Sequence, residues 1–397
     1  MAGYKFLGKE DVSGKTVLVR VDLNSNAEGG ELFPSERIKQ HALTLNQLSE
    51  KGAKTVVLAH QGRKGDEDCI SLQQHADAIK EEIGKEVQLL AWDSDYVSAI
   101  KQMQPGAIIL MENVRFHDNE EKDFTPEEAA KIDWVQKIAS CADLFVQDAL
   151  SVCHRAQPSV VGFNALPCFV GPVLERELGA LAKYEKGERP VLFIFGGAKI
   201  KDSLELMGVI LTSGKADNVC VGGLLGQLFL KASGKNLGET EKTFEEKGFN
   251  TLIEKAQQLL SSFKDKILLP IDLAVVDEDD ERLEITVEEL PTDFLIGDIG
   301  LETVALFKKQ IHKAKLIVFN GPVGMFEKYG LDLATKKVLE AVSKSKAFSI
   351  ISGGDTVDAL REMEFMPTQF SHVSLGGKAL LQYLSGQPLP GLQALQK

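Results

Sequence analysis

The first half of the chain alternates between short apolar runs and longer amphipathic segments. The apolar runs predict β-strands, and the segments between them, such as residues 38–51 and 71–83, have the length of helices. Near-continuous apolar strands separated by helices are typical of a parallel sheet that is covered on both faces. We expect strands at residues 16–21, 55–59, 107–111 and 143–146.

In the second half, four short runs of β-branched or aromatic residues lead into glycine-rich turns and then into helical patterns. Glycine tolerates positive φ, and without a Cβ it lets backbone N–H groups at a helix start point at an anion. One such turn is weak evidence, because glycine also ends strands where the chain simply reverses. Four together predict a shared crevice that binds phosphate groups. The turns are residues 196–199, 320–324, 352–356 and 375–378.

Polar and basic residues, rather than glycine turns, follow the strands of the first half. In parallel sheets, ligands bind beyond the carboxyl ends of the strands. A single surface arginine usually means only a solvated face, but repetition at strand ends predicts guanidinium groups that converge on phosphate or carboxylate. One half should therefore hold a small anion and the other nucleotide phosphates. The residues are Asp22, Asn24, His60, Arg63, Arg115, His154 and Arg155.

The length of 397 residues predicts two or three domains at about 150 residues each, and we expect two. After Gly171-Pro172, apolar residues at positions 174, 178 and 181 follow helical spacing and predict a connecting helix. An ordinary surface helix of either domain is the alternative. The fold class we expect is α/β, with a parallel, doubly wound, Rossmann-like sheet in each domain.

Composition and charge exclude several classes of protein. With 44% hydrophobic and 26% charged residues the chain resembles ordinary soluble globular proteins. The net charge of −13 gives no reason to expect binding to nucleic acid or to an anionic membrane. No apolar stretch approaches the roughly 18 residues of a membrane span, and the first residues lead into no signal-like segment. We expect a cytoplasmic protein.

The five cysteines, at 69, 141, 153, 168 and 220, include no Cys-x-x-Cys pair. The pattern fits neither a disulfide framework nor a zinc site, so we interpret them as reduced thiols. Cys153 precedes His154, and a nucleophilic pair is conceivable. Adjacent residues on an extended segment point to opposite sides, however, which favours a structural role.

Two glycine motifs resemble nucleotide loops but depart from them. Residues 13–16 read Ser-Gly-Lys-Thr, yet the earlier glycine of a Walker-type loop is missing and the motif precedes a strand. Residues 221–226 read Val-Gly-Gly-Leu-Leu-Gly, where valine replaces the first glycine of a dinucleotide fingerprint. Close helix packing explains the latter glycines, so hydride transfer is a weak competitor.

Taken together, the motifs resemble phosphoglycerate kinase over nearly the whole chain. In the first half the resemblance rests on residues 19–24 (Val-Arg-Val-Asp-Leu-Asn), 37–38, 60–63 (His-Gln-Gly-Arg), 112–116 (Glu-Asn-Val-Arg-Phe), 148–149 and 154–156. In the second half it rests on residues 196–199 (Gly-Gly-Ala-Lys), 269–272, 320–327 (Asn-Gly-Pro-Val-Gly-Met-Phe-Glu), 353–356 (Gly-Gly-Asp-Thr) and 389–391.

The resemblance implies roles for these residues. Glu327 would bond the ribose hydroxyls, and Asp355 would lie on the Mg²⁺ side of the nucleotide phosphates. His60 and His154 would orient substrate or support the structure. The implied residues for 3-phosphoglycerate are Asp22, Leu23, Asn24, Arg37, His60, Gln61, Gly62, Arg63, Arg115 and Arg155; for ATP or ADP, Lys199, Asn320, Glu327, Gly353, Gly354, Asp355 and Thr356; and for catalysis, Arg37, Lys199, Gly376 and Gly377.

The family pattern also implies an organisation and a reaction. Residues 1–170 would form the substrate domain, 171–185 the connecting helix, 186–375 the nucleotide domain, and 376–397 a segment that returns to the first domain. A monomer would interconvert 3-phosphoglycerate and 1,3-bisphosphoglycerate with ATP, ADP and Mg²⁺. In-line phosphoryl transfer needs positioning and cations against the developing charge. Two anion sites on separate domains imply closure about the helix.

One departure removes a charge from an expected phosphate site. The lysine expected four positions after Lys199 is Ser203, whereas Lys378 follows the last glycine turn. Lys201 would lie on the wrong helix face to replace it. We hypothesise that Lys378 supplies the missing charge, the alternative being a solvent-exposed lysine. Because a fold does not guarantee a function, a catalytically weakened nucleotide-binding or regulatory protein remains the rival, against which the retained arginines argue.

Overall fold

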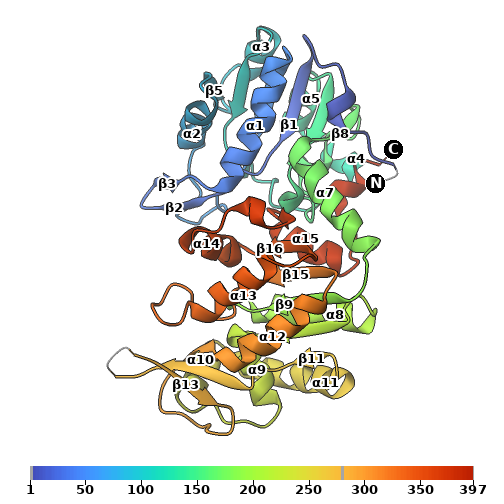
Figure 1. Ribbon diagram of the computed structural model, residues 1–397. Coiled ribbons are helices and arrows are strands. Elements are labelled where there is room, and N and C mark those ends of the chain that lie inside the picture. The colour runs from blue at the N-terminus through green and yellow to red at the C-terminus, as the bar shows by residue number, and fades with distance from the viewer. Residues whose placement is uncertain (1–2, 279–280, 397) are drawn as a thin grey trace. The chain divides into compact units, whose positions relative to one another are not determined.

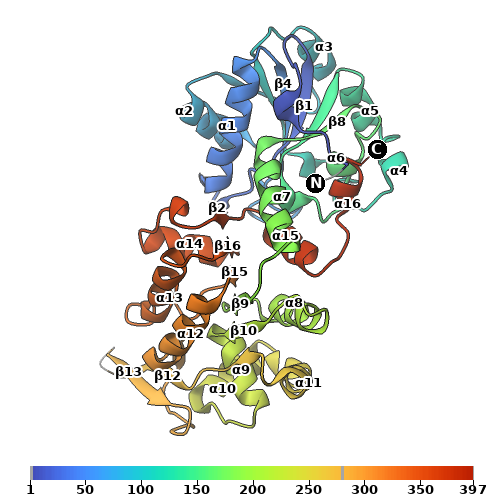
Figure 2. The same ribbon diagram turned by 45° about the vertical axis from the view of Figure 1, so that its right-hand side comes forward.

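The computed structural model describes residues 3–278 and 281–396. The chain divides into two compact units (Figures 1 and 2). We call the part up to Gly179, together with the part from Lys378 onward, the first unit, and Ala180–Gly377 the second unit. The division falls within α7 (Pro172–Glu185), which is the helix expected to connect two domains. The finer domain ranges stay a prediction, and Met1, Ala2 and Lys397 within them lie outside the described residues.

The first unit is built on a six-stranded sheet in the order β5-β6-β4-β1-β7-β8, with every neighbouring pair parallel. Central β1 (Thr16–Arg20) lies between β4 (Lys54–Leu58) and β7 (Leu144–Gln147). The remaining strands are β5 (Val87–Leu90), β6 (Ile108–Met111) and β8 (Cys168–Val170), and a small hairpin joins β2 (Asn26–Glu28) to β3 (Glu31–Phe33).

Side chains alternate between the two faces of this sheet. Val17 and Val19 of β1 belong to a core cluster that includes Ala42 and Leu45 of α1, whereas Leu18 is fully buried outside that cluster. Both faces are therefore covered, as the apolar strands predict. The helices are α1 (Glu36–Glu50), α2 (Gln73–Ile83), α3 (Tyr96–Lys101), α4 (Pro126–Ala129), α5 (Asp133–Ala139), α6 (Pro158–Val161) and α16 (Pro390–Gln393), with α15 (Gly377–Leu384) starting at the unit boundary.

The second unit repeats this architecture with the strand order β11-β10-β9-β15-β16-β17, again parallel throughout. Its strands are β9 (Val191–Phe195), β10 (Asn218–Val221), β11 (Ile267–Leu268), β15 (Leu316–Asn320), β16 (Phe348–Ser352) and β17 (His372–Val373). Its helices are α8 (Ile200–Thr212), α9 (Gly223–Ala232), α10 (Glu241–Glu246), α11 (Ile253–Phe263), α12 (Leu301–Lys313), α13 (Leu333–Ser343) and α14 (Gly354–Glu362).

The structure confirms the expected α/β class and adds elements that the sequence pattern did not predict. A second, antiparallel sheet in the order β13-β12-β14 belongs to the second unit. Its strands are β12 (Asp272–Val276), β13 (Arg282–Thr286) and β14 (Ile296–Ile299). Every residue of β13 is at least partly exposed, so this strand lacks the apolar run that identifies the central strands.

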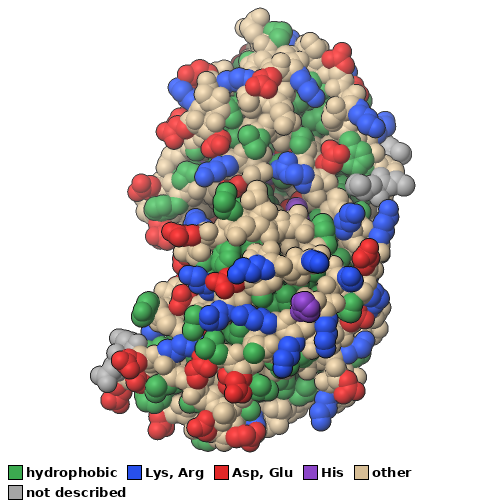
Figure 3. Space-filling view, viewed as in Figure 1, with side chains coloured by type: hydrophobic (Ala, Val, Ile, Leu, Met, Phe, Trp, Pro, Cys, Tyr) green, Lys and Arg blue, Asp and Glu red, His purple; other side chains and the backbone are tan. Residues whose placement is uncertain are grey.

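The surface agrees with the composition. Charged side chains of both signs are spread over the face of each unit seen in Figure 3. Within residues 3–278 and 281–396, every helix is too short or too polar to span a bilayer.

An aromatic cluster in the first unit encloses a histidine. The His117 ring stacks on Trp134 with 4.7 Å between ring centroids, and the edge of Trp92 lies 4.3 Å away by the same measure. Within the described residues, His117 Nε2 is buried without a hydrogen-bond partner. Burial lowers the pKa of His117 to about 4, because removal from water penalises the charged ring.

This histidine should make the first unit sensitive to acid. Its folded-state pKa lies below the ordinary value of 6.5, so the stability it contributes is present above pH 6.5 and is lost as pH falls toward 4. Phenylalanine keeps the ring packing and does not titrate. When the pH falls from 7.5 to 5, the unfolding free energy of His117→Phe should decrease by about 1 kcal/mol less than that of the parent. This figure is discounted for solvent screening, because the His117 ring is only half-buried.

Urea unfolding followed by tryptophan fluorescence measures this difference in the first unit specifically, because both tryptophans, Trp92 and Trp134, lie there. Identical pH dependence in parent and variant would contradict the assignment.

Candidate functional site

In the first unit, the charged residues predicted from the strand ends form one group. Asp22 follows β1 and is buried, and Arg37 at the start of α1 reaches it with 3.3 Å between Nη1 and Oδ2. The same Nη1 donates to the carbonyl of Asn24 at 3.2 Å. Burial alone would raise the pKa of Asp22, but the charge of Arg37 and the hydrogen bond from Ser151 hold that pKa below its usual range. Asp22 therefore stays ionised and orients Arg37.

Two arginines of the same group act on a third. Burial lowers the pKa of Arg155, and the nearby charges of Arg115 and Arg63 lower it further. Arg115 is buried and pairs with Glu121, while its Nε has no partner within the described residues. Arg155 Nε donates to His154 Nε2 at 3.2 Å. The structure thus brings Arg63, Arg115 and Arg155 close enough for their charges to act on Arg155, in a region that also holds the carboxylates of Asp22 and Glu120.

The segment after β4 is held in a fixed shape beside these charges. The N–H of Gly62 donates to Asn24 Oδ1 at 2.8 Å, and Gln61 Nε2 donates to the carbonyl of Ser25 at 2.9 Å. Gly62 has φ +68°, and a Cβ there would lie 2.5 Å from the backbone of Asp68, so only glycine fits. The Gln61 side chain is satisfied inside the protein, which indicates a supporting role for it.

Leu23, which the family pattern assigns to the substrate site, is fully buried in the hydrophobic core. Its side chain offers no polar group, so any contribution to binding would come from its backbone.

In the second unit, three of the four predicted glycine turns meet at the carboxyl ends of neighbouring strands β9, β15 and β16. A Cβ on Gly196 would lie 2.0 Å from the carbonyl oxygen of Pro322, and one on Gly321 would lie 2.4 Å from that of Gly196. The N–H of Gly321 donates to Thr356 Oγ1 at 2.8 Å. Backbone therefore packs directly on backbone, which explains the glycines and confirms that these turns share one edge.

The polar side chains of this edge differ in freedom. Asn320 is buried, and its Oδ1 accepts a hydrogen bond from Ser352 Oγ at 2.9 Å. Lys199 and Asp355 are exposed and face each other, with 3.3 Å between Nζ and Oδ1. Gly353, at φ +94°, caps the start of α14, so Gly354 and Asp355 form its first turn. The backbone N–H groups at a helix start bind phosphate well, and here they lie beside the exposed side chains of Lys199 and Asp355.

One glycine pair that the sequence analysis explained by packing alone lies at the same edge. The N–H of Gly223, at the start of α9, donates to the carbonyl of Val323 at 2.7 Å. A Cβ on Gly222 would lie 2.7 Å from Cβ of Val323. Close packing is thus confirmed, and the turn after β10 becomes a further candidate for the nucleotide site. The position of this turn follows from the order of the strands in the sheet, which the sequence alone does not give.

The last candidate residues are more loosely tied to this edge. Glu327 is exposed, Gly376 is buried, and Gly377 has φ +52° at the start of α15. Ser203 is buried in α8 of the second unit, whereas Lys378 is exposed and belongs to the first unit. Its charge contributes to lowering the pKa of His154, after burial and Arg155. Lys378 therefore lies near the basic group of the first unit, and compensation for Ser203 stays a prediction.

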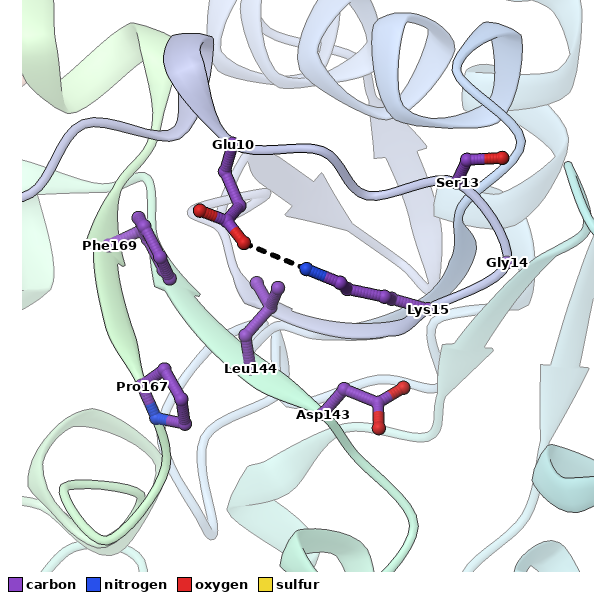
Figure 4. Close-up of a pocket in the computed structure, with 8 residues that line it drawn as sticks. All are labelled: Glu10, Ser13, Gly14, Lys15, Asp143, Leu144, Pro167 and Phe169. Carbon is purple, nitrogen blue, oxygen red and sulfur yellow. Dashed lines mark hydrogen bonds and ion pairs between the residues drawn. The ribbon is translucent and has the colours of Figure 1, made fainter.

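A pocket in the first unit is not part of this arrangement. A pocket of about 340 Å³ lies at the amino ends of the strands and is lined by residues that include Ser13, Gly14 and Lys15 (Figure 4). Lys15 Nζ is bound to Glu10 Oε1 at 2.8 Å, so this cation is already neutralised. The rejection of the Gly-Lys-Thr motif agrees with this geometry, since parallel sheets bind ligands at the opposite edge.

The cysteines play no part in either group. All five lie within the described residues and none forms a disulfide bond, and Cys153 is buried with its Sγ donating to the carbonyl of Ala149 at 3.3 Å. Burial raises the pKa of the Cys153 thiol, which argues against a nucleophile. The structural interpretation of this residue is therefore favoured.

Known proteins give an independent result. The family model described as phosphoglycerate kinase matches residues 7–387. Phosphoglycerate kinase 2 of Methanosarcina acetivorans is 41% identical over 393 residues, covering 97% of this chain and 93% of that protein. Phosphoglycerate kinase of Methanothermobacter thermautotrophicus is 38% identical over 401 residues, covering 99% and 97%.

Among solved structures, phosphoglycerate kinase from Pyrococcus horikoshii superposes with a TM-score of 0.92 at 34% identity, covering 99% of this chain and 98% of that one. A match in sequence and fold over almost the whole length of both proteins places this chain in the phosphoglycerate kinase family.

Proposed function

We propose that this chain transfers a phosphoryl group reversibly between ATP and the carboxylate of 3-phosphoglycerate, giving 1,3-bisphosphoglycerate and ADP. Family membership makes it a kinase of the phosphoglycerate kinase type. The observation that carries the proposal is the contrast between its two units. One gathers arginines at the carboxyl ends of its strands, and the other gathers glycine turns at the equivalent edge.

The first unit would hold 3-phosphoglycerate. This substrate carries a phosphate and a carboxylate, and both accept bidentate bonds from guanidinium groups. The charges of Arg115 and Arg63 lower the pKa of Arg155, so an anion bound beside Arg155 would relieve this repulsion. Asp22 and Asn24 hold the neighbouring backbone and Arg37 in place.

The second unit would hold the nucleotide. Its phosphates would lie at the start of α14, where Gly353, Gly354 and Thr356 offer backbone groups. Asn320 and Thr356 fix the turn through bonds to Ser352 and Gly321. Glu327 is exposed and would accept hydrogen bonds from the ribose hydroxyls.

The donor set fits a magnesium ion that travels with the nucleotide. Within the described residues there is no group of three or more His, Cys, Asp or Glu side chains that could hold a metal by themselves. Mg²⁺ is commonly bound by one or two carboxylates together with phosphate oxygens and water, and Asp355 supplies one exposed carboxylate. When bound, the ion would neutralise charge on the phosphates.

The residues would then catalyse by positioning and by charge. The attacking carboxylate is ionised at neutral pH, because its ordinary pKa is about 4, so no general base is needed. Arg37 and Lys199 would oppose the charge that develops on the transferring group. Gly376 and Gly377, at the start of α15, would offer backbone N–H groups to the same oxygens.

We further propose a cytoplasmic monomer that acts on these small molecules and binds neither nucleic acid nor membrane. The net charge of −13 supports this by disfavouring polyanionic partners.

Steady-state ADP formation from ATP, Mg²⁺ and 3-phosphoglycerate tests the reaction, with the acyl phosphate consumed by a coupling enzyme and each component omitted in turn. We expect turnover of roughly 10 s⁻¹ or more that requires all three components. Tight nucleotide binding without turnover would instead support a weakened regulatory protein on the same scaffold.

Arg37→Ala should lose mainly kcat, with the nucleotide KM close to that of the parent, because the interaction would be strongest in the transition state. Arg176→Ala is the matched control, since Arg176 is exposed in the same unit and donates a hydrogen bond to Gln40. A change confined to the KM for 3-phosphoglycerate would demote Arg37 to a binding role.

Transfer between ligands held by separate units requires that the units close and exclude water. Small-angle scattering should therefore show a smaller radius of gyration with both ligands bound than with either alone. An unchanged radius in the ternary complex would count against closure.

A further inference from the structure

A chain of buried polar groups in the first unit ends at His60. Arg20, the last residue of β1, is fully buried and its Nε donates to Ser159 Oγ at 2.9 Å. Ser159, in α6, donates its hydroxyl to Glu120 Oε1 and its backbone N–H to Glu120 Oε2, the latter at 3.1 Å. On the other side, Arg20 Nη2 lies 3.2 Å from His60 Nδ1. All four residues are buried.

The geometry determines which atoms carry protons. A guanidinium group has only donors, so His60 Nδ1 must accept and the proton of a neutral ring lies on Nε2. Burial and the charge of Arg20 lower the pKa of His60 well below 6.5, which keeps the ring neutral. His60 therefore presents a fixed N–H donor on the side of the ring opposite Arg20.

Arg20 in turn is held from two directions. Its Nη1 donates to the carbonyl of Val21, which directs the guanidinium group along the strand end. Burial lowers the pKa of Arg20 to about 10, and Glu120 is the charge that most opposes this. Both oxygens of Glu120 accept hydrogen bonds from Ser159, so the orientation of the carboxylate is fixed.

We propose that Glu120 is a positioning residue which, through Ser159 and Arg20, fixes the tautomer of His60 that binds 3-phosphoglycerate. The proposal rests on the proposed function, because that function gives His60 a substrate. Glu120 itself touches no substrate: it is fully buried and its oxygens are occupied. Burial raises its pKa to about 7, which shows the cost of keeping a carboxylate there.

The balance of donors predicts what a substitution does. In Glu120→Gln an amide NH₂ replaces one acceptor, so one of the two Ser159 donors loses its partner and Arg20 loses its opposing charge. The hydrogen bond to His60 Nδ1 is then no longer fixed. Ser159→Ala removes the hydroxyl link but leaves Glu120 in place, and it is the smaller change if the first variant does not fold.

Imidazole ¹⁵N NMR of the full-length chain at pH 7.5 reads the tautomer directly. The chain has seven histidines, and the signals that disappear in His60→Asn are those of His60. We expect an unprotonated Nδ1 and a protonated Nε2 in the parent, and a mixture of tautomers in Glu120→Gln and Ser159→Ala. Glu127→Gln, the same change at an exposed glutamate, is the control and should leave the signals unchanged.

The same variants should raise the KM for 3-phosphoglycerate about tenfold, as expected for one misdirected hydrogen bond, while the nucleotide KM stays within about twofold. A protonated Nδ1 in the parent, or an unaltered Nε2–H tautomer in both variants, would overturn the proposal. If the parent shows no turnover with 3-phosphoglycerate, the proposed function fails, and the NMR result still decides the role of Glu120.

Discussion

Parallel pairing of neighbouring strands is the constraint on which both candidate sites depend. In the first unit, β1 pairs in register with β4 and β7, so the chain leaves all three strands at one edge. In the second unit, β9, β15 and β16 do the same. Every strand of a parallel sheet ends on the same side. Residues that are distant in sequence are therefore brought together there by the strand pairing alone.

The two units use this edge in different ways. The first fills it with side chains, and it needs buried carboxylates such as Asp22 and Glu120 because guanidinium groups such as Arg20 cannot be buried uncompensated. The second fills it with backbone, and it needs glycine because Gly196 and Gly321 approach more closely than a Cβ allows. One solution depends on charge balance and the other on the absence of side chains.

Much of this could be predicted from the sequence. Central strands are continuous apolar runs, and polar or glycine-rich residues follow them, so the sequence alone predicts Asp22, Arg115 and Asp355 as candidate site residues. Short or exposed strands such as β13 lack that signal. Partners such as Glu120 could not be found either, because nothing local distinguishes a carboxylate that meets Arg20 through folding from one that faces solvent.

Both candidate sites hold internal ion pairs. Arg37 faces Asp22, and Lys199 faces an exposed Asp355. Exposed pairs contribute only about 0–1 kcal/mol, so Lys199 is available for exchange at little cost. A ligand must nevertheless compete with a carboxylate for each cation. Doubly charged phosphate groups do so better than single carboxylates, because the Coulomb attraction to a cation grows with the charge of the anion.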